Sequence, residues 1–177
     1  MIYYTADLHL GHEAILSMCS RPFSSVADMD EALIRNWNER VHAEDTVYIL
    51  GDLVYRARRP AAEYLCRLKG HKRLVIGNHD RAWLREEGVP RFFEDVCRLD
   101  VINTGFGKAT LCHFPMLDHE GHYLIHGHIH ANTDQPYWPL LRASDRALNA
   151  GVDVNGFRPV TFAELLENNA AFKAAHP

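Results

Sequence analysis

The stretch Thr46-Val47-Tyr48-Ile49-Leu50-Gly51-Asp52 joins a run of β-branched and apolar residues to an abrupt polar end. Such a run predicts a buried β-strand, and the glycine lets the chain turn sharply before the carboxylate. The stretch Ile2-Tyr3-Tyr4-Thr5 leads to Asp7 in the same way, and Arg73-Leu74-Val75-Ile76 leads to Gly77. The sequence therefore repeats one unit, in which a short buried strand ends at a small polar cluster.

Helical patterns separate these three strands. Apolar residues recur at helical spacing from Val26 to Val41, after the candidate cap residues Ser24 and Ser25. A second helix is predicted from Pro60 to Leu68, with proline in its first turn. The alternation of strand and helix predicts a βαβ arrangement in the first half of the chain.

Strands dominate the second half of the chain, which closes with a helix. The stretch from Ala131 to Asp145 is predicted to be an irregular loop that overhangs a site. Thr161 and Glu164 have the spacing of a capping box for a helix from Phe162 to Leu166. The predicted strands are Val96–Ile102, Lys108–Cys112, Tyr123–Ile125 and Ala147–Asn149. Together these elements predict an α/β fold in a single domain, residues 1–177.

The composition narrows the class of protein. The formal net charge of −4 over 177 residues does not favour a protein that coats nucleic acid or an anionic membrane. The chain has no run of about 18 apolar residues and no signal segment at its start, so we expect a cytoplasmic protein without a membrane partner. The four cysteines lack a C-x-x-C pair and are expected to be buried thiols. The 12 histidines, several beside Asp, Asn or Gly, point to metal or acid–base chemistry.

Each of five polar clusters follows a predicted strand. They are Asp7-Leu8-His9, Gly51-Asp52, Gly77-Asn78-His79-Asp80, His113 and Gly127-His128-Ile129-His130. The carboxyl ends of neighbouring strands lie together at one edge of a sheet, and residues two apart in an extended chain face the same side. Carboxylate, amide and imidazole groups without thiolates suit Mn, Fe or Zn. Seven such groups exceed the needs of one tetrahedral zinc ion and suit two ions with open positions for water and substrate.

The five clusters, in this order from residue 7 to residue 130, resemble the motifs of the calcineurin-like metallophosphoesterase superfamily, and the chain is similar to its small bacterial members. The resemblance implies a four-layer α-β-β-α sandwich, with two mixed sheets flanked by helices. It also implies hydrolysis of a phosphomonoester or phosphodiester by a hydroxide that bridges two divalent ions. Mn is the metal that we expect, with Fe, Zn, Ni or Co as alternatives.

The resemblance also implies that seven side chains hold the two ions and that one carboxylate is shared between them. The expected ligands are Asp7, His9 and His130 for the first ion, Asn78, His113 and His128 for the second ion, and Asp52 for both. His79 matches the superfamily's histidine that does not bind metal, so it is expected to act as the general acid for the leaving oxygen.

The chain departs from the superfamily pattern at Tyr55, three positions after the bridging aspartate, where many relatives have Asp or Asn. In protein phosphatases that Asp partners the catalytic histidine, so the departure argues against a protein phosphatase and leaves the orientation of His79 to be explained. Arg56 falls where those enzymes carry a phosphate-binding arginine, although the locally basic loop favours a solvated charge as its interpretation. The further candidates for substrate contact are His12 and Arg21.

The expected substrate is a small phosphate ester. A nuclease or a cyclic-nucleotide phosphodiesterase is the alternative enzyme, although phosphate contacts along a nucleic acid need clustered Lys or Arg. A catalytically inactive protein-binding scaffold is expected to lack some of the matched residues, and a zinc-stabilised structural module would need closed four-ligand sites. The sequence predicts neither the oligomeric state nor a preference between monoesters and diesters.

Overall fold

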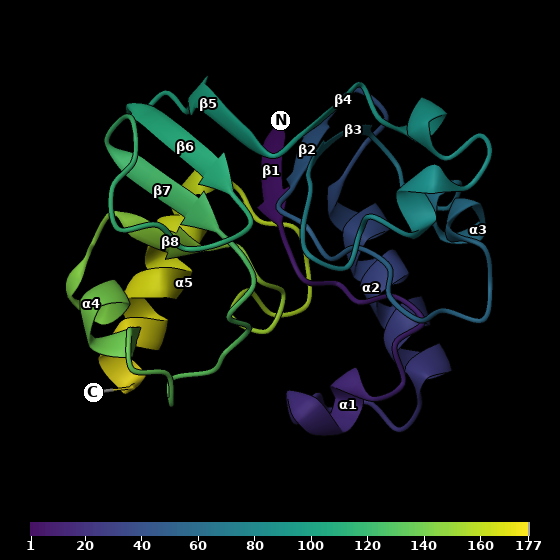
Figure 1. Cartoon of the computed structure of the whole chain (residues 1–177), viewed down its shortest axis with the longest axis horizontal. Coiled ribbons are helices and arrows are strands. Elements are labelled where there is room, and N and C mark those ends of the chain that lie inside the picture. The colour runs from purple at the N-terminus through teal and green to yellow at the C-terminus, as the bar shows by residue number, and fades with distance from the viewer. Residues whose placement is uncertain (177) are drawn as a thin grey trace.

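Two four-stranded sheets lie side by side in the computed structural model, which describes residues 1–176 (Figure 1). The first sheet is parallel throughout. Its strands, in spatial order, are β1 (Ile2–Thr5), β2 (Thr46–Ile49), β3 (His71–Val75) and β4 (Asp95–Cys97). Parallel neighbours need crossover connections. These crossovers contain the helices α1 (Ile15–Met18), α2 (Val26–Arg40) and α3 (Ala61–Leu65) and the 3-10 turns Trp83–Arg85 and Pro90–Phe92.

The second sheet is mixed. β5 (Leu99–Asn103) and β6 (Lys108–Cys112) form an antiparallel hairpin, whereas β7 (Tyr123–His126) and β8 (Ala147–Asn149) add in parallel. The helices α4 (Trp138–Ala143) and α5 (Phe162–Ala175) accompany this sheet (Figure 1). The predicted α/β fold with two helix-flanked sheets is therefore confirmed. Both sheets were expected to be mixed, but the first sheet is wholly parallel.

Four element predictions need correction. The strand predicted at Val96–Ile102 is two strands, because β4 pairs with β3 and β5 pairs with β6, and the chain changes sheets at Arg98. The predicted loop 131–145 contains α4, whose first turn holds a proline. The helix predicted to end at Leu68 ends at Leu65, and the closing helix extends beyond Leu166 to Ala175.

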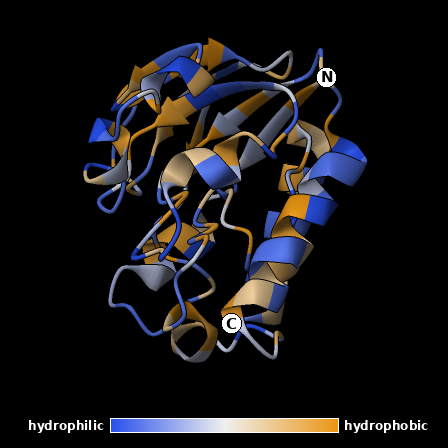
Figure 2. Ribbon diagram, turned by 90° about the vertical axis from the view of Figure 1, so that its right-hand side faces the viewer, coloured by the Kyte–Doolittle hydropathy of each residue, from blue (hydrophilic) through white to orange (hydrophobic). Residues whose placement is uncertain are grey.

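Alternation along the strands of the first sheet explains why it separates two cores. Val47 and Ile49 pack into a core with α2, in which Trp37 is fully buried. Tyr48 points to the opposite face and joins a second core between the sheets, together with Leu111 of β6. Because successive side chains of a strand point to opposite faces, one apolar strand supplies both cores. Figure 2 shows hydrophobic and hydrophilic colours following one another along the long helix on its right-hand side, as expected for a helix with one covered face.

The predicted caps define the starts of the two long helices. The side chain of Ser25 accepts a hydrogen bond from the Asp28 amide at 3.1 Å before α2. At α5, Thr161 and Glu164 form the complete capping box that their spacing predicts. Over residues 1–176, no helix combines the length and the apolar character needed to cross a membrane.

The cysteine prediction was wrong in its detail. Cys66 is exposed, and Cys19, Cys97 and Cys112 are half-buried. All four remain thiols in the described part of the chain, as expected from their wide spacing.

Candidate metal centre

The polar clusters that follow the strands meet between the two sheets. Asp7 and Asp52 follow β1 and β2 of the first sheet, and His113 and His128 follow β6 and β7 of the second. The ligand atoms of Asp7, Asp52 and His113 all lie within 4.8 Å of one another. Two sheets therefore contribute to one buried polar centre.

A second group of ligand atoms, from Asp7, His9 and His130, also fits within 4.8 Å. Asp7 Oδ1 and His9 Nε2 are buried and have no hydrogen-bond partner among the described residues. An unpaired buried polar atom is costly, so these two atoms need a partner that the protein itself does not supply. A divalent cation fits this donor set, because carboxylate and imidazole are ordinary ligands of Mn, Fe and Zn.

Asp52 belongs to the first group and also approaches His9 of the second group. Its Oδ2 is 3.6 Å from His9 Nε2 and 3.5 Å from His113 Nε2, which is too long for a good hydrogen bond. Asn78, which is exposed, has its Oδ1 2.9 Å from His113 Nε2. The His128 ring centroid lies 5.1 Å from that of His113. All seven residues that the sequence predicts as ligands therefore border this centre.

Burial sets the protonation of the metal-free centre. Burial raises the pKa of the Asp7 carboxyl to about 8 and also raises the pKa of Asp52. Burial lowers the pKa of the imidazoles of His9, His113 and His128. Neutral imidazoles are the form that binds metal, whereas the carboxyls must lose a proton when a cation arrives.

The backbone at the centre is strained. Asp7, His9, Asp52, His128 and His130 have φ values of 57°, 52°, 55°, 73° and 50°. Residues other than glycine adopt this left-handed conformation at a cost and gather at functional sites. A Cβ at Gly127 would lie 2.7 Å from Asp7 Oδ2, so only glycine permits this close approach of the second sheet.

Asp153 supports the centre and was missed in the sequence. Its carboxylate accepts hydrogen bonds from His130 Nδ1 at 2.9 Å and from Arg21 Nε at 2.8 Å. Burial alone would raise its pKa, but these bonds hold the pKa of Asp153 below its usual range. Burial would lower the pKa of His130, but the bond to Asp153 and the nearby carboxylates raise it to about 10. The His130 ring must therefore lose a proton before its Nε2 can bind a cation, while the bond to Nδ1 orients the ring. Asp153 follows β8 at a short distance, so the strand-end pattern that identified the other clusters could have identified it.

Arg21 is enclosed, whereas the sequence offered it as a substrate contact. Its side chain is fully buried, and its guanidinium donates to Asp153 and to the carbonyls of Leu8 and Asp7. These bonds hold the ligand-bearing loop after β1 in place. Asp80, expected beside the centre, accepts hydrogen bonds from the amides of Asp52 and Gly77.

His79 stands at the rim of the centre. Its amide donates to Asp52 Oδ1 at 2.9 Å, and its half-buried ring lies against the ring of Tyr55, with centroids 3.8 Å apart. His12 has its Nδ1 3.2 Å from His9 Nδ1, and Arg56 places its guanidinium 5.2 Å from the Tyr55 ring centroid. Tyr55 therefore occupies the neighbourhood in which many relatives would have a carboxylate or amide.

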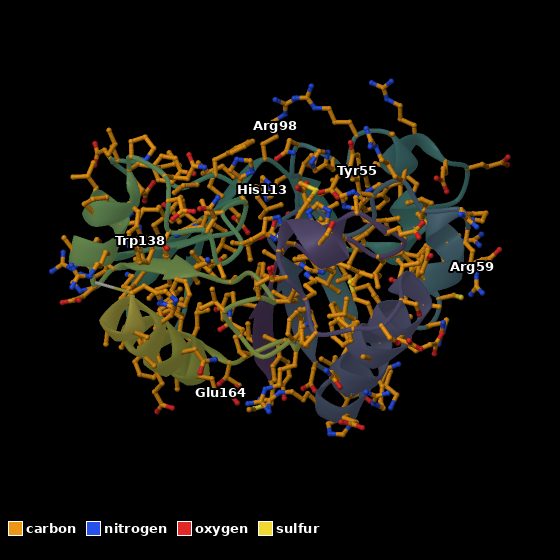
Figure 3. All side chains as sticks on the ribbon, turned by 90° about the horizontal axis from the view of Figure 1, so that it is seen from below. Tyr55, Arg59, Arg98, His113, Trp138 and Glu164 are labelled. Carbon is orange, nitrogen blue, oxygen red and sulfur yellow. The ribbon has the colours of Figure 1, made fainter. Side chains whose placement is uncertain are left out.

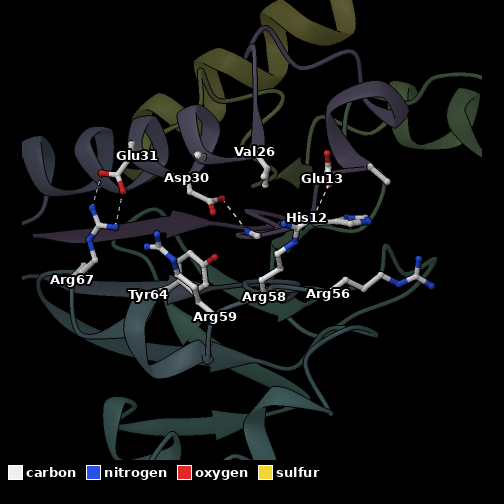
Figure 4. A pocket seen from close by; sticks show the side chains of 13 residues that line it. His12, Glu13, Val26, Asp30, Glu31, Arg56, Arg58, Arg59, Tyr64 and Arg67 are labelled. Carbon is white, nitrogen blue, oxygen red and sulfur yellow. Dashed lines mark hydrogen bonds and ion pairs between the residues drawn. The ribbon is translucent and has the colours of Figure 1, made fainter.

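A polar hollow of about 480 Å³ adjoins this rim (Figure 4). Figure 4 shows His12 and Arg56 at one end of the hollow and Arg67, paired with Glu31, at the other. Asp30 lies between them and accepts a hydrogen bond from the Gly11 amide at 2.9 Å. The hollow contains charges of both signs.

Comparisons with known proteins give one matching family model and several similar chains. A family model described as calcineurin-like phosphoesterase matches residues 1–128. An uncharacterized protein of Methanocaldococcus jannaschii, MJ1445, is 36% identical over 166 residues, which cover 90% of this chain and 86% of that protein. The Gene 66 protein of Mycobacterium phage D29 is 33% identical over 181 residues, with 86% and 87% covered.

A solved structure is similar over nearly the whole chain. The crystal structure of AQ665, a protein of unknown function from Aquifex aeolicus, superposes with a TM-score of 0.74 at 26% sequence identity. The match covers 94% of this chain and 98% of the other.

Proposed function

This chain belongs to the calcineurin-like phosphoesterase family, and on that premise we propose that it hydrolyses a small phosphate ester with two divalent cations. The observation that carries the proposal is the position of Asp52. Its Oδ2 lies within 3.6 Å of imidazole nitrogens from both ligand groups. One carboxylate placed between two donor groups is what a pair of neighbouring cations requires.

The proposed ligand set divides as the sequence predicts. Asp7, His9 and His130 would hold one cation, Asn78, His113 and His128 the other, and Asp52 both. When bound, two such cations lower the pKa of water and offset the charge on phosphoryl oxygens. Mn²⁺ is the proposed metal, with Fe, Zn, Ni and Co as alternatives that accept the same ligands.

His79 is the proposed general acid. In the proposed reaction, water releases a proton to solvent and its oxygen forms a bond to phosphorus. The bond from phosphorus to the alcohol oxygen breaks, His79 gives that oxygen a proton, and His79 regains a proton from solvent. The Tyr55 ring, 3.8 Å away between centroids, is the proposed positioning group, because it limits rotation of the imidazole. We propose that this contact takes the place of the aspartate that orients the catalytic histidine in protein phosphatases.

Arg56 and His12 are the proposed contacts to the substrate. Arg56 is exposed, and together with His12 it lines the polar hollow next to the centre. Arg56 and His79 also line a neighbouring hollow. A guanidinium in this place suits a phosphoryl oxygen. The mixed charges of the hollow support a small ester more than a long nucleic acid, which needs a continuous basic surface.

The test is metal-dependent turnover. Protein stripped with chelator and resupplied with Mn²⁺ is expected to hydrolyse an aryl phosphate monoester or diester. Asp52→Asn is expected to abolish turnover and weaken metal retention, whereas the exposed control Asp118→Asn is expected to behave as wild type. Absence of turnover with Mn, Fe, Zn, Ni and Co would favour an inactive binding scaffold of the same fold.

A further inference from the structure

An apolar hollow of about 390 Å³ opens beside the metal centre, on the side of the second sheet. It lies between the segment after β6, which includes Phe114 and Leu117, and the region of α4, which includes Tyr137 and Leu140. Apart from His128, every residue that lines it is apolar or aromatic. Ligand pockets of this size are usually apolar with a few polar groups that fix orientation.

The apolar walls are open to solvent. Leu117 is 92% exposed, Leu140 62% and Phe114 44%. Contiguous apolar surface of this kind marks a binding site more often than isolated exposed residues do. The fold has not covered these side chains, so they are free to contact a ligand.

The hollow is continuous with the metal centre. The Phe114 ring centroid lies 4.6 Å from that of His128 and 4.9 Å from that of His113, and both histidines are proposed ligands. His128 itself lines the hollow. A group that fills the hollow is therefore adjacent to the position of the phosphorus, which favours part of the substrate as the occupant over a separate partner.

The hollow and the proposed general acid lie on different sides of the centre. Figure 3 shows Tyr55, which packs on His79, and Trp138, which begins α4, on opposite sides of His113. The alcohol that receives the proton leaves on the His79 side. An apolar group of the substrate that binds in the hollow is consequently the substituent that stays attached to phosphorus after the alcohol has left.

We propose that this hollow binds the retained aryl or alkyl arm of a phosphodiester, so that the enzyme prefers diesters with one apolar arm. The inference rests on the proposed function and adds its substrate class. Phe114 and Tyr137 offer aromatic faces, and Met116 offers a sulfur that packs well against rings. The nearly complete lack of polar lining favours a plain hydrocarbon arm over a nucleobase, whose edges need hydrogen-bond partners.

The test compares two esters that differ only in the retained arm. Both p-nitrophenyl phenylphosphonate and p-nitrophenyl methylphosphonate release p-nitrophenolate, with water as the second reactant. After correction for their rates in hydroxide solution, the phenyl ester is expected to have a kcat/KM at least about tenfold higher. Leu117→Asp and Leu140→Asp are expected to move this ratio toward one, and the control Val96→Asp, at an exposed apolar residue of β4, to leave it unchanged.

A binding measurement separates this inference from the proposed function. Phenylphosphonate is expected to bind more tightly than methylphosphonate by calorimetry, with a more negative heat-capacity change that reports apolar burial. Equal binding, or a kcat/KM ratio near one in the wild type, would overturn the inference. A kcat/KM ratio that both Asp variants preserve would also overturn the inference.

If Leu140→Asp instead converts a dimer to a monomer, the apolar hollow is a contact between two copies of the chain, and the inference is overturned. If neither ester is hydrolysed, the proposed function fails, and calorimetry still tests the hollow.

Discussion

Replacing Tyr55 with alanine removes the ring that lies against His79, and we expect hydrolysis to slow only for esters whose leaving alcohol needs a proton. The two rings have centroids 3.8 Å apart and planes inclined by 34°. The His79 side chain is 32% exposed, so the loss of Tyr55 opens one face of the imidazole to solvent. The imidazole would then occupy several orientations instead of one.

The size of the effect follows from the contact that is lost. An aromatic pair contributes about 0.5–1.5 kcal/mol, and about 1.4 kcal/mol corresponds to a factor of ten. We therefore expect kcat for an alkyl ester to fall about two- to tenfold in Tyr55→Ala. Tyr55→Phe keeps the ring and is expected to stay close to wild type. His79→Ala removes the acid itself, which commonly contributes about 10²–10⁴-fold.

The assay measures kcat over a series of esters, from p-nitrophenyl to aliphatic leaving groups. Because p-nitrophenolate leaves without protonation, the loss in Tyr55→Ala is expected to grow with the pKa of the leaving alcohol. Metal content of every variant, including His79→Ala, is expected to equal that of wild type. An equal loss of kcat for all esters, or an equal loss in Tyr55→Phe, would refute the positioning role of Tyr55. Loss of metal in His79→Ala would refute the assignment of His79 as a group that does not bind metal.

Three further outcomes are expected. Arg21→Met should lower the free energy of unfolding by about 3–5 kcal/mol, because the buried Asp153 carboxylate loses its guanidinium partner and keeps only the bond to His130. Loss of the exposed ion pair in Arg67→Met should cost less than about 1 kcal/mol; equal urea midpoints would contradict this. The rise in Tm on adding Mn²⁺ should grow from pH 6 to pH 8. The pKa of Asp7 is raised to about 8 in the folded protein, so the metal-free protein loses stability as the pH rises toward that value. A rise in Tm that does not depend on pH would contradict this prediction. Gly127→Ala should reduce bound metal in elemental analysis, since its Cβ would press on Asp7 Oδ2 at 2.7 Å, and full metal content would show that the loop can shift.

Local sequence patterns were sufficient to predict the strands whose ends carry the residues of the centre. Val47, Tyr48 and Ile49 belong to a continuous apolar run, which predicted a buried strand, and the structure places them alternately in the two cores. The polar residue at the end of each such strand then had to lie at the sheet edge, and the convergence of Asp7, Asp52 and His113 follows from this rule. The roles of these residues toward metal and substrate remain proposals.

Tertiary pairing decided what the sequence could not show. A single residue, Arg98, separates two strands that pair with different sheets, and nothing local marks the change of partner. Asp153 gains its importance only because folding places it against Arg21 and His130. Likewise, the position of α4 beside Phe114 creates the apolar hollow, and no pattern along the chain encodes that meeting.

The division of the ligand groups between two sheets has a consequence for synthesis on the ribosome. The first sheet is complete once Cys97 has emerged, yet His113, His128 and His130 are still to be translated. A nascent chain at that stage offers a cation only part of the ligand set and holds it weakly. With the proposed ligand set, capture of metal would therefore come late and would require that the C-terminal half of the polypeptide has been made and packed.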